Sequence, residues 1–278
     1  MRSGSVVTGA PGPVYPVNPT GEPILGRQTL PDIESLPEGV DLALLSLPAA
    51  AVADALTRLG RRRVRAAVVL ASGFGEVDDR GRASQRDLVS IARAAGLRLV
   101  GPNCMGVYSA PARLNGTYFW DLPRLPGRIG VVSQSGAYGG MIFRHLGARK
   151  LGVARFLSIG NQADVDVADI LEYLADDAAT ALIVCFLEAV RDGRRFVEAA
   201  RRATGRKPVV VLKAGRSEAG RRAAGSHTPA RSPVPTRSTG RRSATPTWCS
   251  RRRRRSSSTR SRRWRSRAAG APLRLASR

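Results

Sequence analysis

The sequence has few of the residues that build disulfide frameworks and metal sites. Its 278 residues include 3 cysteines and 2 histidines. Cys104, Cys185 and Cys249 are far apart, odd in number and form no C-x-x-C pair, so neither a disulfide framework nor a His/Cys metal site is supported. These absences fit a reduced compartment, and we expect a cytoplasmic protein without a bound metal.

Long apolar runs are also lacking. No stretch approaches the roughly 18 to 20 apolar residues that a membrane-spanning helix needs. The opening residues, MRSGSVVTGAPG, have no apolar core of the kind found in signal peptides. We therefore expect no membrane partner.

Acidic residues are missing from the end of the chain. Residues 229–278 contain 16 arginines and no lysine or acid, whereas the first 228 residues carry 30 basic and 21 acidic side chains. This segment has no strand or helix periodicity and too few apolar residues to offset chain entropy, so we expect a disordered basic tail. It would bind nucleic acid only non-specifically, if at all, in a salt-sensitive way.

Short apolar runs alternate with amphipathic segments over the rest of the chain. Runs of this kind are typical of strands buried on both faces of a parallel sheet. The expected strands are residues 13–18, 40–48, 65–72, 97–103, 128–136, 153–161, 181–189 and 207–215. The expected helices are residues 49–62, 81–95, 136–150, 167–175, 193–204 and 217–224. The alternation predicts a doubly wound α/β fold.

The stretch at residues 115–128 is rich in proline, glycine and aromatic residues and separates two sets of four expected strands. We place a domain boundary at 122–127. The predicted parts are a first α/β domain at 1–122, a second at 127–228 and the tail at 229–278. Ligands of such sheets bind beyond the carboxyl ends of the strands.

One strand end is suited to phosphate. In VVSQSGAYGG, residues 131–140, the residues Gln134, Ser135 and Gly136 lie between an expected strand and helix. Small residues let backbone N–H groups surround an anion, and a helix start adds unpaired donors and about half a positive charge. The plainer alternative is that Ser135 only caps the helix, which contributes roughly 1 kcal/mol.

His227 is the second candidate. A neutral imidazole can attack phosphorus and leave again near neutral pH. A carboxylate that accepts from its other ring nitrogen would hold the tautomer, and Glu188, after the run LIVCFL, has the right chemistry. The alternative is a surface histidine in a Gly/Ser turn.

Several motifs occur together in order: GPNCMG, VVSQSGAYGG, SIGNQADVDVADILEYLADD, FLEAVRDGRRFVEAA and KPVVVLKAGRSEAGRRAAGSHT. This set resembles the NDP-forming acyl-CoA synthetases, the family of ADP-forming acetate–CoA ligase and the succinyl-CoA synthetase α subunit. The resemblance covers roughly residues 13–228. A related module occurs fused to protein acetyltransferase domains.

The resemblance implies a Rossmann-like CoA-binding domain followed by a flavodoxin-like, succinyl-CoA synthetase-like domain. It implies the reaction of acyl-CoA, ADP and phosphate to a carboxylic acid, CoA and ATP through a phosphohistidine. His227 falls on the phosphorylated residue and Glu188 on the acid that orients it. Ser135 and Gly136 fall on the helix start that holds the phosphoryl group.

The same resemblance assigns the substrates and partners. Asn103 would lie in the acyl-CoA pocket, and Ser46 and Pro48 along CoA. ADP or ATP with Mg²⁺ would bind a partner, either an ATP-grasp domain or a β subunit. The acid would be a small carboxylic acid. The alternative function is a non-catalytic CoA or acyl-CoA-binding module.

Three features depart from the family pattern. The Gly-rich pyrophosphate loop expected before PGPVYPVNP is missing, which suggests truncation at the N-terminus. Pro229 directly follows Thr228 where the family continues with a Gly/Ala loop. One GC-rich back-translation of residues 230–240, read two bases later, resembles that loop, so we interpret the tail as a frameshift. No ATP-grasp domain is present, and we expect the chain alone to be impaired.

Overall fold

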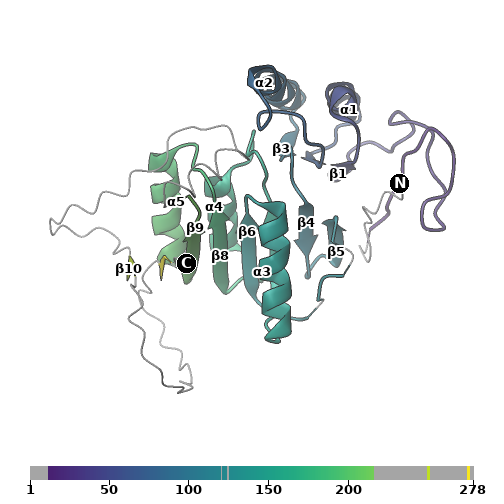
Figure 1. The fold of residues 1–278 in the computed structure, drawn as a ribbon. Helices are drawn as coiled ribbons and strands as arrows, with labels where there is room; N and C mark the ends of the chain where they lie inside the picture. Colours follow the sequence, from purple (N-terminus) through teal and green to yellow (C-terminus); the bar gives the residue numbers. More distant parts are fainter. Residues whose placement is uncertain (1–11, 120, 124, 216–248, 251–273, 276–278) are drawn as a thin grey trace.

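Two β-sheets organise the protein. The computed structural model describes residues 12–119, 121–123, 125–215, 249–250 and 274–275 (Figure 1). The first sheet has the order β1-β2-β3 and is parallel. Its strands are β1 (Leu42–Leu45), β2 (Ala66–Val69) and β3 (Arg98–Val100). Its helices are α1 (Ala49–Arg61) and α2 (Asp79–Ala94).

The second sheet has eight strands in the order β10-β11-β9-β8-β6-β7-β4-β5. Its strands are β4 (Gly106–Ser109), β5 (Leu114–Thr117), β6 (Ile129–Ser133), β7 (Val153–Ser158), β8 (Leu182–Leu187), β9 (Val209–Lys213), β10 (Cys249–Ser250) and β11 (Arg274–Leu275). Its helices are α3 (Gly136–Ala148), α4 (Val167–Asp176) and α5 (Gly193–Thr204). The strands from β10 to β7 are parallel, and β4 runs antiparallel to both β7 and β5.

Alternation along the strands divides the second domain into two cores. In β6, Val131 packs with Phe143 of α3, whereas its neighbour Val132 packs with α4 and α5. Figure 1 shows α3 in front of the second sheet. Helices α4 and α5 pack together in the other core. The apolar strand runs are therefore buried on both faces where helices cover them, as the sequence predicted.

Local signals explain where the helices begin. Asp166 caps α4 by accepting from the backbone N–H groups of Ala168 and Asp169, and the Asp169 carboxylate accepts from the Asp166 N–H in return. Asp78 caps α2 and Asp192 caps α5 in the simpler one-sided form. Each cap satisfies donors that a helix start leaves unpaired.

The hairpin of β4 and β5 joins the two domains. Its edge pairs with β7, with Tyr108 opposite Phe156, so it belongs to the second sheet. Its other contacts reach the first sheet, where Val107 and Tyr118 pack against the buried Val68. The hairpin therefore covers the face of the first sheet that α1 and α2 leave open.

A buried carboxylate also ties the domains together. The Asp164 side chain has no exposed surface and accepts from the Leu99 N–H at 3.0 Å. It also pairs with Arg93 at 2.9 Å and Arg98 at 2.8 Å, both from the first domain. Burial alone would raise the pKa of the Asp164 carboxyl, but these three donors outweigh it and hold the pKa below its usual range.

Two strand predictions need correction. The strand expected at 13–18 is wrong: this segment contributes only an isolated bridge from Val17 to Leu30. Its two prolines, Pro13 and Pro16, have no N–H to donate to a ladder. The hairpin at 106–117 was not expected, and it joins the second sheet although it precedes the expected boundary at 122–127. The sets are therefore three and eight strands rather than four and four.

The five described helices agree with prediction to within a few residues, and α5 has the predicted bounds. The helix expected at 217–224 lies outside the described residues. Within the part of the chain that the structure describes, no helix is long and apolar enough to cross a membrane.

Asp164→Asn should lower the free energy of unfolding by about 2 kcal/mol at neutral pH, because the amide cannot balance the charges that face it. Urea denaturation measures this. The pKa of Asp164 is depressed, so the stabilisation is complete above the unfolded-state pKa of about 3.9 and is lost as pH falls through the lower folded-state value. The gap between wild type and variant should therefore close below about pH 4.

Glu198→Gln is the matched control, because its ion pair with Arg194 is largely exposed, with 59% of the Glu198 side chain accessible. It should change stability by less than about 0.5 kcal/mol. Equal losses of unfolding free energy in the two variants would contradict the stabilising role assigned to Asp164 between the domains.

Candidate functional site

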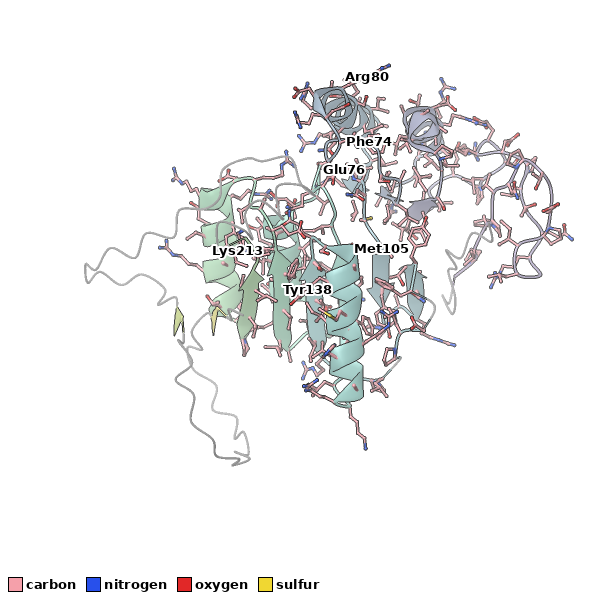
Figure 2. All side chains as sticks on the ribbon, in the orientation of Figure 1. Phe74, Glu76, Arg80, Met105, Tyr138 and Lys213 are labelled. Atoms are coloured by element: carbon pink, nitrogen blue, oxygen red, sulfur yellow. The ribbon has the colours of Figure 1, made fainter. Side chains whose placement is uncertain are left out.

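The carboxyl ends of the strands gather the candidate residues at one junction. Figure 2 shows Met105, Tyr138 and Lys213 along the upper edge of the second sheet, with Phe74 and Glu76 of the first domain above them. Ligand sites of open α/β sheets form at such edges. The site therefore includes loops of both domains.

The start of α3 provides backbone donors. Ser135 is the N-cap residue, and its hydroxyl accepts from the Tyr138 N–H at 3.3 Å. Helix geometry leaves the N–H groups of Gly136 and Ala137 without an intrahelical acceptor. With the partial positive charge of the helix start, they make a suitable place for an anion.

Glycines let α3 approach the sheet closely. A Cβ on Gly136 would collide with Met105, and one on Gly139 would lie 2.8 Å from the Phe156 ring and from the Ser133 Cβ. Met105 is itself held by a hydrogen bond from its N–H to the Ser158 hydroxyl, at 3.0 Å. A side chain at either glycine would push the helix start away from the strand ends.

Gln134 is buried, with 5% of its surface exposed, and connects β6 to the end of β8. Its side-chain oxygen accepts from the N–H groups of Glu188 at 2.7 Å and Ala189 at 2.9 Å. Sequence reasoning placed Gln134 on the phosphate. In the structure its side-chain oxygen instead holds the backbone after β8, and its place on phosphate stays a prediction.

Lys213 is the last residue of β9, and it also contacts this turn. Its ammonium donates to the Glu188 carbonyl at 2.6 Å and to the Ala214 carbonyl at 2.7 Å. Burial lowers the pKa of the Lys213 ammonium, and the nearby Glu188 carboxylate partly offsets this. Sequence reasoning assigned Lys213 no role, although a lysine that closes the run VVVL was a visible signal.

Asn103 lies in a polar network between the domains. Its side-chain amide donates to the side-chain oxygen of Asn161, Oδ1, at 3.2 Å. Asn161 in turn donates to Glu76 at 2.5 Å and to Gln85 at 2.8 Å. Glu76 also accepts from the Gly73 N–H at 2.6 Å and so holds the loop after β2. Neither Glu76 nor Asn161 was assigned from the sequence, because the contact joins residues 85 positions apart.

Ser46 and Pro48 are exposed at the carboxyl end of β1. The Ser46 hydroxyl lies 3.3 Å from the Tyr118 hydroxyl, and Pro48 is the N-cap residue of α1. Both are open to a ligand that runs along this edge. His227 lies outside the described residues, so its distance from Glu188 is not part of the described site.

The described residues hold no group of three or more His, Cys, Asp or Glu side chains that could bind a metal ion. Cys104 and Cys185 are both buried and free. Burial raises the pKa of the Cys104 thiol to about 12 and raises that of Cys185 even further. Neither thiol is suited to nucleophilic chemistry at neutral pH.

Comparison with known proteins places this geometry in a family. Residues 7–110 match a CoA binding domain, and residues 126–233 match a succinyl-CoA ligase like flavodoxin domain. The second match includes position 227. The chain is 41% identical over 218 residues to the α subunit of acetate–CoA ligase [ADP-forming] II of Pyrococcus furiosus. It carries the α-like domain pair of the NDP-forming acyl-CoA synthetases.

A second curated ligase and a solved synthetase structure are also similar. Acetate–CoA ligase [ADP-forming] I of Archaeoglobus fulgidus is 42% identical over 217 residues. A solved structure of the dinucleotide forming acetyl-coenzyme A synthetase 1 of Ca. Korarchaeum cryptofilum, in complex with phosphate and ADP, superposes with a TM-score of 0.74 at 39% identity. That alignment covers 79% of this chain and 47% of the solved chain.

The chain spans less than half the length of these two curated relatives. The alignments cover 78% of this chain in both ligases, but only 47% of the Pyrococcus protein and 32% of the Archaeoglobus protein. The similarity therefore covers the two domains of this chain. The remaining parts of those relatives lie outside the alignments.

Ser135→Ala should lower the free energy of unfolding by about 1 kcal/mol, because the Tyr138 N–H loses its acceptor. Ser135→Asp should keep nearly all of the stability, since a carboxylate caps a helix equally well. Urea denaturation of the three proteins tests this. An alanine variant as stable as the wild type would contradict the capping role of Ser135.

Proposed function

We propose that this chain supplies the CoA-binding and phosphohistidine domains of an NDP-forming acyl-CoA synthetase. The reaction converts acyl-CoA, ADP and phosphate to a carboxylic acid, CoA and ATP. The observation that carries the proposal is the hydrogen bond from the Glu188 N–H to the Gln134 side chain, because Gln134 directly precedes Ser135, the N-cap residue of α3. The similarity to ADP-forming acetate–CoA ligases supports the same chemistry.

In the first step, a phosphate oxygen attacks the thioester carbonyl of acyl-CoA. The carbon–sulfur bond breaks, the CoA thiolate leaves with the electron pair and takes up a proton, and acyl phosphate remains. The N–H groups of Gly136 and Ala137 would hold the phosphate at the start of α3. Ser46 and Pro48 would lie along CoA, with Asn103 near the acyl group.

In the second step, a nitrogen of His227 attacks phosphorus. The bond from phosphorus to the acyl oxygen breaks, and the carboxylate leaves with the electron pair. The other ring nitrogen keeps its proton and would donate a hydrogen bond to the Glu188 carboxylate. The carboxylate would also stabilise the positive charge that develops on the ring. Glu188 would thus hold the imidazole in the tautomer that attacks.

The final transfer of the phosphoryl group to ADP needs a nucleotide site. The α-subunit relative suggests that an ATP-grasp domain or a β subunit provides it, with Mg²⁺ on the nucleotide. The acid would be a small carboxylic acid. A non-catalytic CoA-binding module is the alternative outcome of the experiment below.

Incubation of the full chain with [³²P]acetyl phosphate should transfer the label to protein without a nucleotide partner. The label should be acid-labile and base-stable, as expected for a phosphohistidine, and His227→Asn should reduce it at least a hundredfold. His145→Asn is the matched control, because the chain has 2 histidines and His145 is exposed on α3. It should retain the label.

Label that persists in His227→Asn would contradict the proposal. A wild-type chain that binds CoA in calorimetry but takes no label from acetyl phosphate, or from [³²P]phosphate with acetyl-CoA, would favour the non-catalytic module.

A further inference from the structure

The peptide groups around Glu188 are held from both sides by side chains of neighbouring strands. Gln134, after β6, accepts from the N–H groups of Glu188 and Ala189, at 2.7 and 2.9 Å. Lys213, at the end of β9, donates to the carbonyl of Glu188 at 2.6 Å. β8 lies between β6 and β9 in the sheet, so the two contacts approach its end from opposite neighbours.

Both positions carry polar side chains where packing alone would accept apolar ones. Gln134 is 5% exposed, and a buried carboxamide must be hydrogen-bonded to avoid a desolvation penalty. Lys213 brings a partly buried ammonium to a strand end that is otherwise apolar, in the run VVVL. A leucine or methionine at position 134 would fill similar space but would leave the N–H groups of Glu188 and Ala189 without this acceptor.

The turn after β8 needs such support, because Glu188 follows the last ladder residue of the strand, Leu187. Two residues earlier, Phe186 stacks on Tyr138 of α3 with ring centroids 4.1 Å apart. The Leu187 carbonyl still accepts from the Ala214 N–H at 2.7 Å, and the side-chain bonds to Glu188 and Ala189 extend this fixed backbone beyond the ladder. Fixing both the N–H and the carbonyl of Glu188 fixes the orientation of the backbone that carries its carboxylate.

We propose that Gln134 and Lys213 are positioning residues that hold Glu188 in place for the phosphohistidine step. The catalytic role of the two residues rests on the proposed function, and their placement rests on the hydrogen bonds to the Glu188 and Ala189 backbone. Lys213 acts through the Glu188 backbone rather than on the phosphoryl group. Removing Lys213 should therefore harm phosphoryl transfer only while Glu188 has a carboxylate to position.

The experiment combines two measurements on the full chain. The first is the rate of labelling by [³²P]acetyl phosphate in wild type, Lys213→Met, Glu188→Gln and the double variant. As a single substitution, Lys213→Met should slow labelling about tenfold. Added to Glu188→Gln, it should slow labelling by less than a further twofold. Lys213→Arg, which keeps a donor and a charge, should recover most of the rate.

The second measurement is amide hydrogen exchange at Glu188 and Ala189. Both amides should be protected in the wild type and exchange at least tenfold faster in Gln134→Met, which removes the acceptor and keeps the volume. Methionine is a suitable replacement because it adapts to irregular buried space.

Lys207→Met is the matched control for loss of a lysine. Lys207 precedes β9 and likewise donates to two backbone carbonyls, those of Leu174 and Asp177, both at 2.6 Å. Burial lowers the pKa of its ammonium too. This variant should destabilise the fold to a similar extent as Lys213→Met and leave the labelling rate within twofold of the wild type.

Each outcome decides between the claims. An undiminished tenfold loss in the Glu188→Gln background would show that Lys213 acts independently and would overturn the inference. If the wild type takes label but Gln134→Met exchanges its Glu188 and Ala189 amides no faster than the wild type, the inference is also overturned. The proposed function would then remain intact. A wild type that takes no label refutes the proposed function, and with it the catalytic purpose of the two residues, whatever the amides show.

Discussion

Close contact between two loops, one after β3 and one after β7, sets the geometry of the whole molecule. Gly160 has φ of +48°, and a Cβ there would collide with the backbone oxygens of Pro102 and Asn103. Backbone hydrogen bonds continue the contact, from the Asn161 N–H to Pro102 at 3.0 Å and from the Ala163 N–H to the Gly101 carbonyl at 2.9 Å. Backbone cannot yield as a flexible side chain can, so these bonds leave the domains little freedom to rotate.

This contact explains why the candidate site includes both sheets. The carboxyl ends of β3 and β7 meet there, so the loop that carries Asn103 lies beside the strands that carry Ser135 and Glu188. Polar groups of the junction are paired with one another, since an unpaired buried group would cost about as much as the contact gains. The Asp164 carboxylate and the Asn161 amide each bond to groups of the first domain, so the junction is specific in register as well as close.

Periodicity and motifs were sufficient for the fold class, the five described helices and the strand ends at which the candidate site lies. They were insufficient where a tertiary contact decides. The hairpin of β4 and β5 has no long apolar run, because Asn115 and Thr117 are buried polar residues bonded to each other and to the Phe119 carbonyl. The contacts of Gln134 were equally out of reach of the sequence. Its partner, Glu188, is 54 residues away, and only the pairing of β6 with β8 brings them together.

The Glu76 carboxylate of the first domain also bonds across this junction. Glu76 accepts from the Gly73 and Phe74 N–H groups of its own loop and from the Asn161 amide across the junction. A displacement of this loop by a ligand along β1 and β2 must therefore either break the bond to Asn161 or move it. Asn161 also holds Asn103, at 3.2 Å, so the displacement reaches the loop proposed to contact the acyl group. On the proposed function, occupation of the CoA edge and the arrangement of the acyl pocket are thus linked by hydrogen bonds rather than by distance alone.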